Sequence, residues 1–109
     1  MNTSANSSAT WISSFADLSK RLAEKNIVIH SLRADWGSFG SWQLIAVKRE
    51  EAIRFTYDGR DSFVIVDSSP MRNYSAPNEW REEIVKGIDN RKNEALDFCE
   101  EFLSNKFNP

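Results

Sequence analysis

Cysteine and histidine are nearly absent from this chain, which contains one residue of each, Cys99 and His30. A single cysteine excludes an intramolecular disulfide, which fits a reducing compartment. One histidine and one cysteine are too few for the usual four-ligand zinc site. No nucleophile motif accompanies His30, so we interpret it as a structural residue, and we predict no metal ion and no cofactor.

Long apolar runs and an excess of one charge sign are also lacking. No apolar stretch approaches the roughly 20 residues that span a bilayer. Residues 1–8 have neither the basic segment nor the apolar segment of a secretory signal. The formal net charge is -2, unlike the basic footprint that is typical of nucleic-acid binders. We therefore expect a cytoplasmic protein with no membrane partner and no nucleic-acid partner.

The chain does contain an ordinary globular mixture, with 40% hydrophobic and 28% charged side chains over 109 residues. A chain of this length forms one domain around one core. Residues 1–8 are small and polar, so we predict a disordered N-terminal tail there. The single domain is then expected to cover residues 9–109.

The spacing of apolar residues predicts the first helix and the strands of this domain. Residues 10–25 are predicted to form a helix, because apolar residues recur there at helical spacing. These residues are Trp11, Phe15, Leu18 and Leu22. Alternating or β-branched runs predict four strands, at residues 27–30, 42–47, 52–57 and 62–66. Two longer loops are expected, at residues 34–41 and 67–78.

The pair Asp58-Gly59 lies between two of these apolar runs and predicts a β-hairpin, because glycine accepts a positive φ without a steric penalty. The loop length sets the register of the two strands. A loop of two, three or four residues starting at Asp58 pairs Phe55 with Ser62, Phe63 or Val64, respectively. The two longer loops match apolar residues better and are therefore favoured.

After residue 78, apolar residues recur at helical spacing as far as about residue 106. They are Trp80, Ile84, Ile88, Ala95, Cys99 and Phe102. Gly87 interrupts the pattern, so we predict either one long bent helix or two shorter helices. The resulting fold class is α+β: an N-terminal helix and the C-terminal helices pack on one face of a four-stranded, mainly antiparallel sheet over residues 27–67.

Large side chains in the two predicted loops are the candidate contact residues for a partner. Trp36 and Phe39 lie in the first loop, and Met71, Arg72 and Tyr74 lie in the second. Aromatic residues and arginine are common binding anchors on loops. The competing interpretation is that Trp36 and Phe39 only cover one end of the core and that the second loop is plain surface.

The leading functional hypothesis is a non-enzymatic protein-binding module, such as a small inhibitor, immunity or adaptor protein. It rests on the lack of catalytic, metal-binding and phosphate-binding motifs and on the aromatic loops. The alternative is a small-molecule-binding protein or weak enzyme, with a pocket between sheet and helix that is lined by His30, Asp35 or Arg54. A homodimer formed through an edge strand or through the C-terminal helix is a third possibility.

Overall fold

A computed structural model of the chain describes residues 3–35, 40–71, 79–88 and 94–107. These residues form two helices and five strands. In chain order they are α1 (Thr3–Ala23), β1 (Val28–Asp35), β2 (Ser41–Lys48), β3 (Glu51–Asp58), β4 (Phe63–Pro70), β5 (Arg81–Gly87) and α2 (Glu94–Phe107). The predicted α+β class is confirmed.

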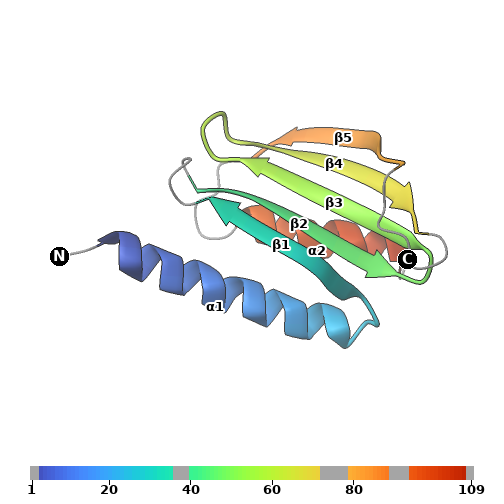
Figure 1. The fold of residues 1–109 in the computed structure, drawn as a ribbon, viewed down its shortest axis with the longest axis horizontal. Helices are drawn as coiled ribbons and strands as arrows, with labels where there is room; N and C mark the ends of the chain where they lie inside the picture. The colour runs from blue at the N-terminus through green and yellow to red at the C-terminus, as the bar shows by residue number, and fades with distance from the viewer. Residues whose placement is uncertain (1–2, 36–39, 72–78, 89–93, 108–109) are drawn as a thin grey trace.

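The five strands form one antiparallel sheet in the order β1-β2-β3-β4-β5, so each strand pairs with its neighbour in the chain. Both helices lie on the same side of this sheet, and the other side is open (Figure 1). α1 runs along the edge strand β1, whereas α2 packs beneath the centre of the sheet near β3. The predicted packing of the helices on one sheet face is therefore confirmed.

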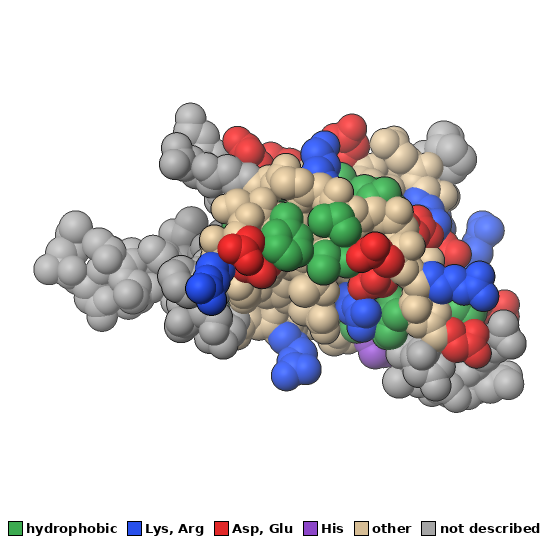
Figure 2. All heavy atoms as spheres, turned by 90° about the horizontal axis from the view of Figure 1, so that it is seen from above, with side chains coloured by type: hydrophobic (Ala, Val, Ile, Leu, Met, Phe, Trp, Pro, Cys, Tyr) green, Lys and Arg blue, Asp and Glu red, His purple; other side chains and the backbone are tan. Residues whose placement is uncertain are grey.

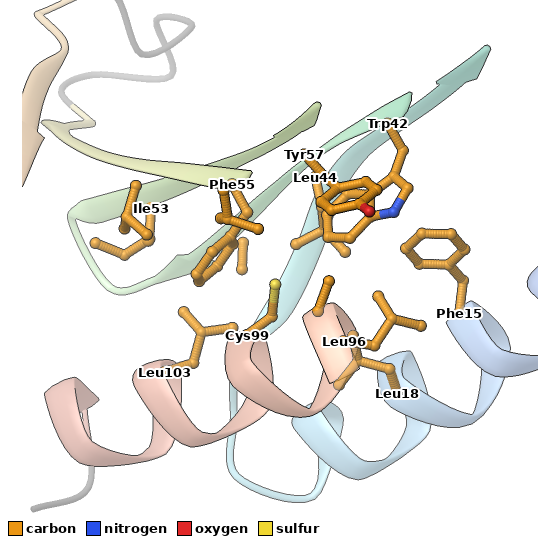
Figure 3. Close-up of a cluster of buried hydrophobic side chains, with 14 of the residues drawn as sticks. Phe15, Leu18, Trp42, Leu44, Ile53, Phe55, Tyr57, Leu96, Cys99 and Leu103 are labelled. Carbon is orange, nitrogen blue, oxygen red and sulfur yellow. The ribbon is translucent and has the colours of Figure 1, made fainter. Parts of the chain in front are cut away.

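The core lies between the helices and the sheet (Figure 3). From α1 the buried side chains are Phe15, Leu18 and Leu22. From α2 they are Ala95, Leu96, Cys99 and Leu103. The buried residues of both helices recur at spacings of three and four, which places them on one face of each helix. The sheet supplies the opposite wall through alternate residues of its three central strands.

Aromatic rings fill much of the space between the two layers. The ring of Trp42 stacks on Tyr57 with centroids 5.5 Å apart, and it meets Phe15 edge-on at 5.4 Å. Phe55 likewise contacts Phe102 edge-on at 5.8 Å. The Nε1–H of Trp42 is buried and has no hydrogen-bond partner in the described part of the chain. Ring packing therefore fixes the position of this indole.

The prediction of a helix that starts after residue 78 is wrong. Residues Arg81–Gly87 form the fifth strand, β5, and α2 begins only at Glu94. The misleading signal is the four-residue spacing of Trp80, Ile84 and Ile88, because four is a multiple of the two-residue period of a strand. The sheet therefore has five strands, and Gly87 ends a strand.

The register of the β3–β4 hairpin differs from all three predicted registers. Phe55 pairs with Val66, and Asp58 pairs with Phe63. The loop does contain four residues, but they are residues 59–62, because Asp58 is the last residue of β3. This shift keeps apolar residues opposite one another on the helix-facing side of the sheet.

The turn of this hairpin is held by Asp58. Its Oδ1 accepts backbone N–H groups from Arg60 at 2.9 Å and from Asp61 at 3.0 Å. The positive φ that reverses the chain is at Ser62, with a value of 56°, and Gly59 does not have a positive φ. Asp58 thus forms an Asx-type turn, which explains the displaced loop.

Several predicted boundaries also move. α1 begins at Thr3, before the predicted helix 10–25 and inside the segment 1–8, whose disorder stays a prediction. β1 extends to Asp35 and β4 extends to Pro70. Parts of both predicted loops therefore belong to strands.

Candidate functional site

Only one of the five predicted contact residues lies within the described part of the chain. Met71 follows β4, is half-buried, and donates its backbone N–H to the carbonyl oxygen of Glu50 at 2.7 Å. Trp36, Phe39, Arg72 and Tyr74 lie outside the described residues. The proposed contact surface of these five residues therefore stays a prediction.

The residues expected to line the alternative small-molecule pocket do not form a common site. His30 is exposed in β1, where the pairing with β2 shifts between Ile29 and Ser31. Arg54 lies in β3, two strands away in the sheet. Asp35 ends β1. β1 is an edge strand, and its bulge lies at His30. The bulge therefore explains why His30 is exposed.

Arg54 instead belongs to a small cluster on the open side of the sheet. Its Nη2 lies 2.9 Å from Oδ2 of Asp67, and its Nε donates to the same oxygen at 3.0 Å. The guanidinium carbon also lies 4.2 Å from the centre of the Trp80 ring. Asp67 is 8% exposed. The two charges are matched, and the ring contact fastens Trp80, the residue just before β5, to the middle of the sheet.

The open side of the sheet also carries hydrophobic side chains (Figure 2). Near the centre of this face they form a group with acidic and basic side chains around it. Val28 at the β1 edge is 62% exposed, and Val85 at the β5 edge is 55% exposed. These two residues lie at opposite edges of the sheet, so they do not form one contact surface.

A cleft between α1 and β1 is better defined. Its volume is about 370 Å³. From α1 it is lined by Ile12, Phe15, Ala16 and Ser19. From β1 it is lined by Ile29, Leu32 and Ala34. Two large side chains of this lining are exposed: Ile12 at 64% and Leu32 at 41%. The cleft therefore presents apolar surface that is not buried in the core.

The cleft exists because the apolar stripe of α1 is wider than the part that the sheet covers. Beside the buried stripe, a second row follows at spacings of four, three and four. It consists of Ile12, Ala16, Ser19 and Ala23. This row contains no charged side chain, whereas Asp17, Arg21 and Glu24 lie elsewhere on the helix. The β1 residues opposite it share the side of the sheet that faces the helices.

Among the described residues that line the cleft, none has a titratable side chain, and the Ser19 hydroxyl is their only polar side-chain group. General acid–base catalysis and metal binding both need ionisable or ligating groups, which these lining residues do not supply. Within the described ranges, no group of three or more His, Cys, Asp or Glu residues could hold a metal ion. The described lining is suited to binding apolar groups.

The alternative hypothesis from the sequence placed a pocket between sheet and helix, but it named none of the residues that line this cleft. The signal was present in the uncharged row from Ile12 to Ala23, one step around the helix from the predicted stripe. The other wall needed the position of β1 relative to α1, which depends on tertiary packing and not on local pattern.

Comparison with models of protein families, with curated proteins and with solved structures gives no match. Among the described residues, neither helix combines the length and the apolar character needed to cross a membrane.

Proposed function

We propose that the chain is a non-enzymatic protein-binding module, of the inhibitor, immunity or adaptor type, and that the cleft between α1 and β1 holds apolar side chains of the partner. The exposed Ile12 and Leu32 at an uncharged cleft are the observation that supports this proposal. Burial of apolar area drives most protein association, and anchors in pockets supply much of its free energy.

The test compares two variants of the same strand. Leu32→Lys places a charge in the cleft, whereas Val28→Lys places it on the open side of the sheet. We expect a partner from the native lysate to be retained by the unmodified protein and by Val28→Lys, and to be lost by Leu32→Lys. Circular dichroism and thermal unfolding check that both variants are folded. Equal retention by the three proteins would contradict a role for the cleft.

The loop residues of the sequence hypothesis are tested in the same experiment. Trp36→Ala and Tyr74→Ala should weaken retention of the partner if the loops share the contact with the cleft. Normal retention by both variants would restrict the contact to the cleft.

Small-molecule binding is the second candidate, because a cleft of about 370 Å³ falls in the ~300–1,000 Å³ range of ligand sites. Indole, titrated into isotope-labelled protein, should then shift the amide resonances of Ala16 and Leu32. An unchanged spectrum would count against this candidate.

Two further proposals concern the location of the protein and its self-association. We propose a cytoplasmic location, since the single cysteine is free and buried.

Self-association through an edge strand or through α2 is the third functional proposal, and sedimentation at several protein concentrations tests it. A constant monomer mass would remove it.

A further inference from the structure

We infer that the partner binds as an extended segment that adds to β1 as a sixth strand and places alternate apolar side chains in the cleft. This inference rests on the proposed function and specifies the class of partner for the same site. Strand addition to a sheet edge combines backbone hydrogen bonds with side-chain pockets at every second residue.

The first argument is the position of β1 in the sheet. β1 pairs with β2 alone among the described strands, so one row of its backbone N–H and C=O groups has no strand partner. After the shift at His30 the pairing is regular from Ser31 to Asp35. This part of the edge therefore offers a regular template for another strand.

The second argument is the alignment of the cleft with this edge. Leu32 and Ala34 line the cleft and pair with the buried Leu44 and Trp42, so they point to the helix side of the sheet. Side chains of an added strand alternate between the same two sides. Every second one would enter the cleft beside Ile12, and the others would lie on the open side.

The third argument is the contrast with the other edge. All residues of β5 are exposed, and four of them are charged. The hollow beside β5 is lined by Lys86, Glu94, Asp97 and Glu101, among others. Charges of this kind protect a sheet edge against strand addition. The helix side of β1 has no such protection.

The charge of Arg33 indicates which kind of residue the added strand would carry on the open side of the sheet. Arg33 is exposed there and makes no ion pair with a described residue. An acidic residue of the added strand beside Arg33 would gain an opposite charge across the strand pair. The occupant is therefore an extended segment that is apolar at alternate positions and carries an acidic residue on the other side.

A second copy of the chain fits this edge less well. Regular pairing of β1 covers only Ser31 to Asp35, a length of roughly 17 Å. A contact between two such edges falls well short of the ~800 Å² per partner that a stable dimer buries. A flexible segment that inserts side chains into the cleft needs no comparable flat area.

The probe is a nine-residue peptide, blocked at both ends, in which leucine or valine alternates with threonine and one threonine position carries aspartate. Its binding is followed by amide resonances and hydrogen exchange of the isotope-labelled full chain. We expect slower amide exchange in Ser31–Asp35 and shifted resonances at Ile12 and Ala16. Absence of binding at about 1 mM peptide would overturn the inference, as would binding that leaves exchange in β1 unchanged.

Two N-methylated peptides test the backbone contact itself. One is methylated at every apolar residue, and the other at every polar residue, so that each blocks one edge of the added strand. Only one edge faces β1, so we expect one peptide to lose binding and the other to keep it. Equal behaviour of the two peptides would overturn strand addition.

The variants separate this inference from the proposed function. Leu32→Lys should lower the affinity for the peptide at least about tenfold, because a charged group would enter an apolar cleft. Val28→Lys should change this affinity less than about twofold. Ile12→Lys repeats the test from the helix side. If no peptide binds but a partner is lost on Leu32→Lys, only strand addition fails. If Leu32→Lys retains that partner, the proposed function itself fails.

Discussion

At the scale of single residues, Arg54 shows how a polar cluster can be both open to solvent and structural. Its guanidinium lies between the carboxylate of Asp67 and the ring of Trp80. We expect Arg54→Met to lower the free energy of unfolding by about 1.5–3 kcal/mol, because it leaves the nearly buried Asp67 charge without its partner. Urea denaturation measures the change.

Arg33 is the matched control for that measurement. It lies on the same side of the sheet, is exposed, and has no ion pair with a described residue. Arg33→Met should change the unfolding free energy by less than about 0.5 kcal/mol. Equal effects of the two substitutions would show that the Arg54–Asp67 contact contributes nothing specific.

Cys99 illustrates a buried residue whose chemistry is suppressed. Its side chain is completely buried in α2, and desolvation raises the pKa of its thiol well above the usual value. The reactive thiolate is therefore scarce, and reagents also lack access. We expect an aromatic disulfide reagent at pH 8 to react at least about a hundredfold more slowly with the native chain than with the chain in urea. Reaction of the native chain at the rate of a free thiol would contradict the burial of Cys99.

At the scale of elements, the β3–β4 turn makes a direct test of the observed register. Ser62 holds a φ of 56°, a conformation that costs most residues free energy but not glycine. We expect Ser62→Gly to stabilise the protein by about 0.5–1 kcal/mol. Gly40→Ala, at a φ of 74°, should destabilise the protein instead. Denaturant titration of both variants measures these changes in stability. A loss of stability in Ser62→Gly would argue against the observed turn.

The contact between α2 and β5 predicts a response to acid. Oε1 of Glu83 accepts a hydrogen bond from Lys106 at 3.2 Å. A hydrogen bond with Ser68 lowers the pKa of Glu83 most, Lys106 lowers it further, and burial opposes both. A lowered folded-state pKa gives stability that is present above the unfolded value of about 4.3 and is lost as the pH falls through the lower folded value.

Glu83→Gln should therefore weaken the fall in stability below about pH 4.3. At neutral pH the cost should stay below about 1 kcal/mol, since the pair is partly exposed. Glu82→Gln, the neighbouring residue of the same strand, is the control. Thermal unfolding at several pH values compares the two variants. Identical acid profiles for Glu83→Gln and the unmodified protein would rule out the contact.

The elements also show how far a pattern in the sequence can be trusted. β2 and β3 were predictable because alternate residues face the core, and α1 because Phe15, Leu18 and Leu22 share a face. β5 was not, because Trp80 and Ile84 keep a spacing that suits both periods. The register shift between β4 and β5 after Val66 removes the regular alternation that would have indicated a strand.

At the scale of the whole molecule, the candidate site depends on how α1 and β1 are placed relative to each other. Hydrogen bonds with α2 help to set this placement: Arg21 Nε of α1 donates to Glu100 at 3.0 Å, and Lys25 Nζ, in the turn after α1, donates to Ser104 at 2.6 Å. These partners are 79 positions apart in the chain. Local pattern carries no information on such distant pairs, so the fold class was predictable, whereas the residues that line the cleft were not.

The order of the elements along the chain also affects how the protein is made. Each strand pairs with its neighbour in the chain, so the sheet can form while the chain is still leaving the ribosome. α2 is synthesised after all five strands. Until residues 94–107 have emerged, Phe55 and Val66 lack the helix that covers them. The nascent sheet therefore exposes an apolar face until α2 has emerged, and a chaperone that holds apolar surfaces would find its target in that interval.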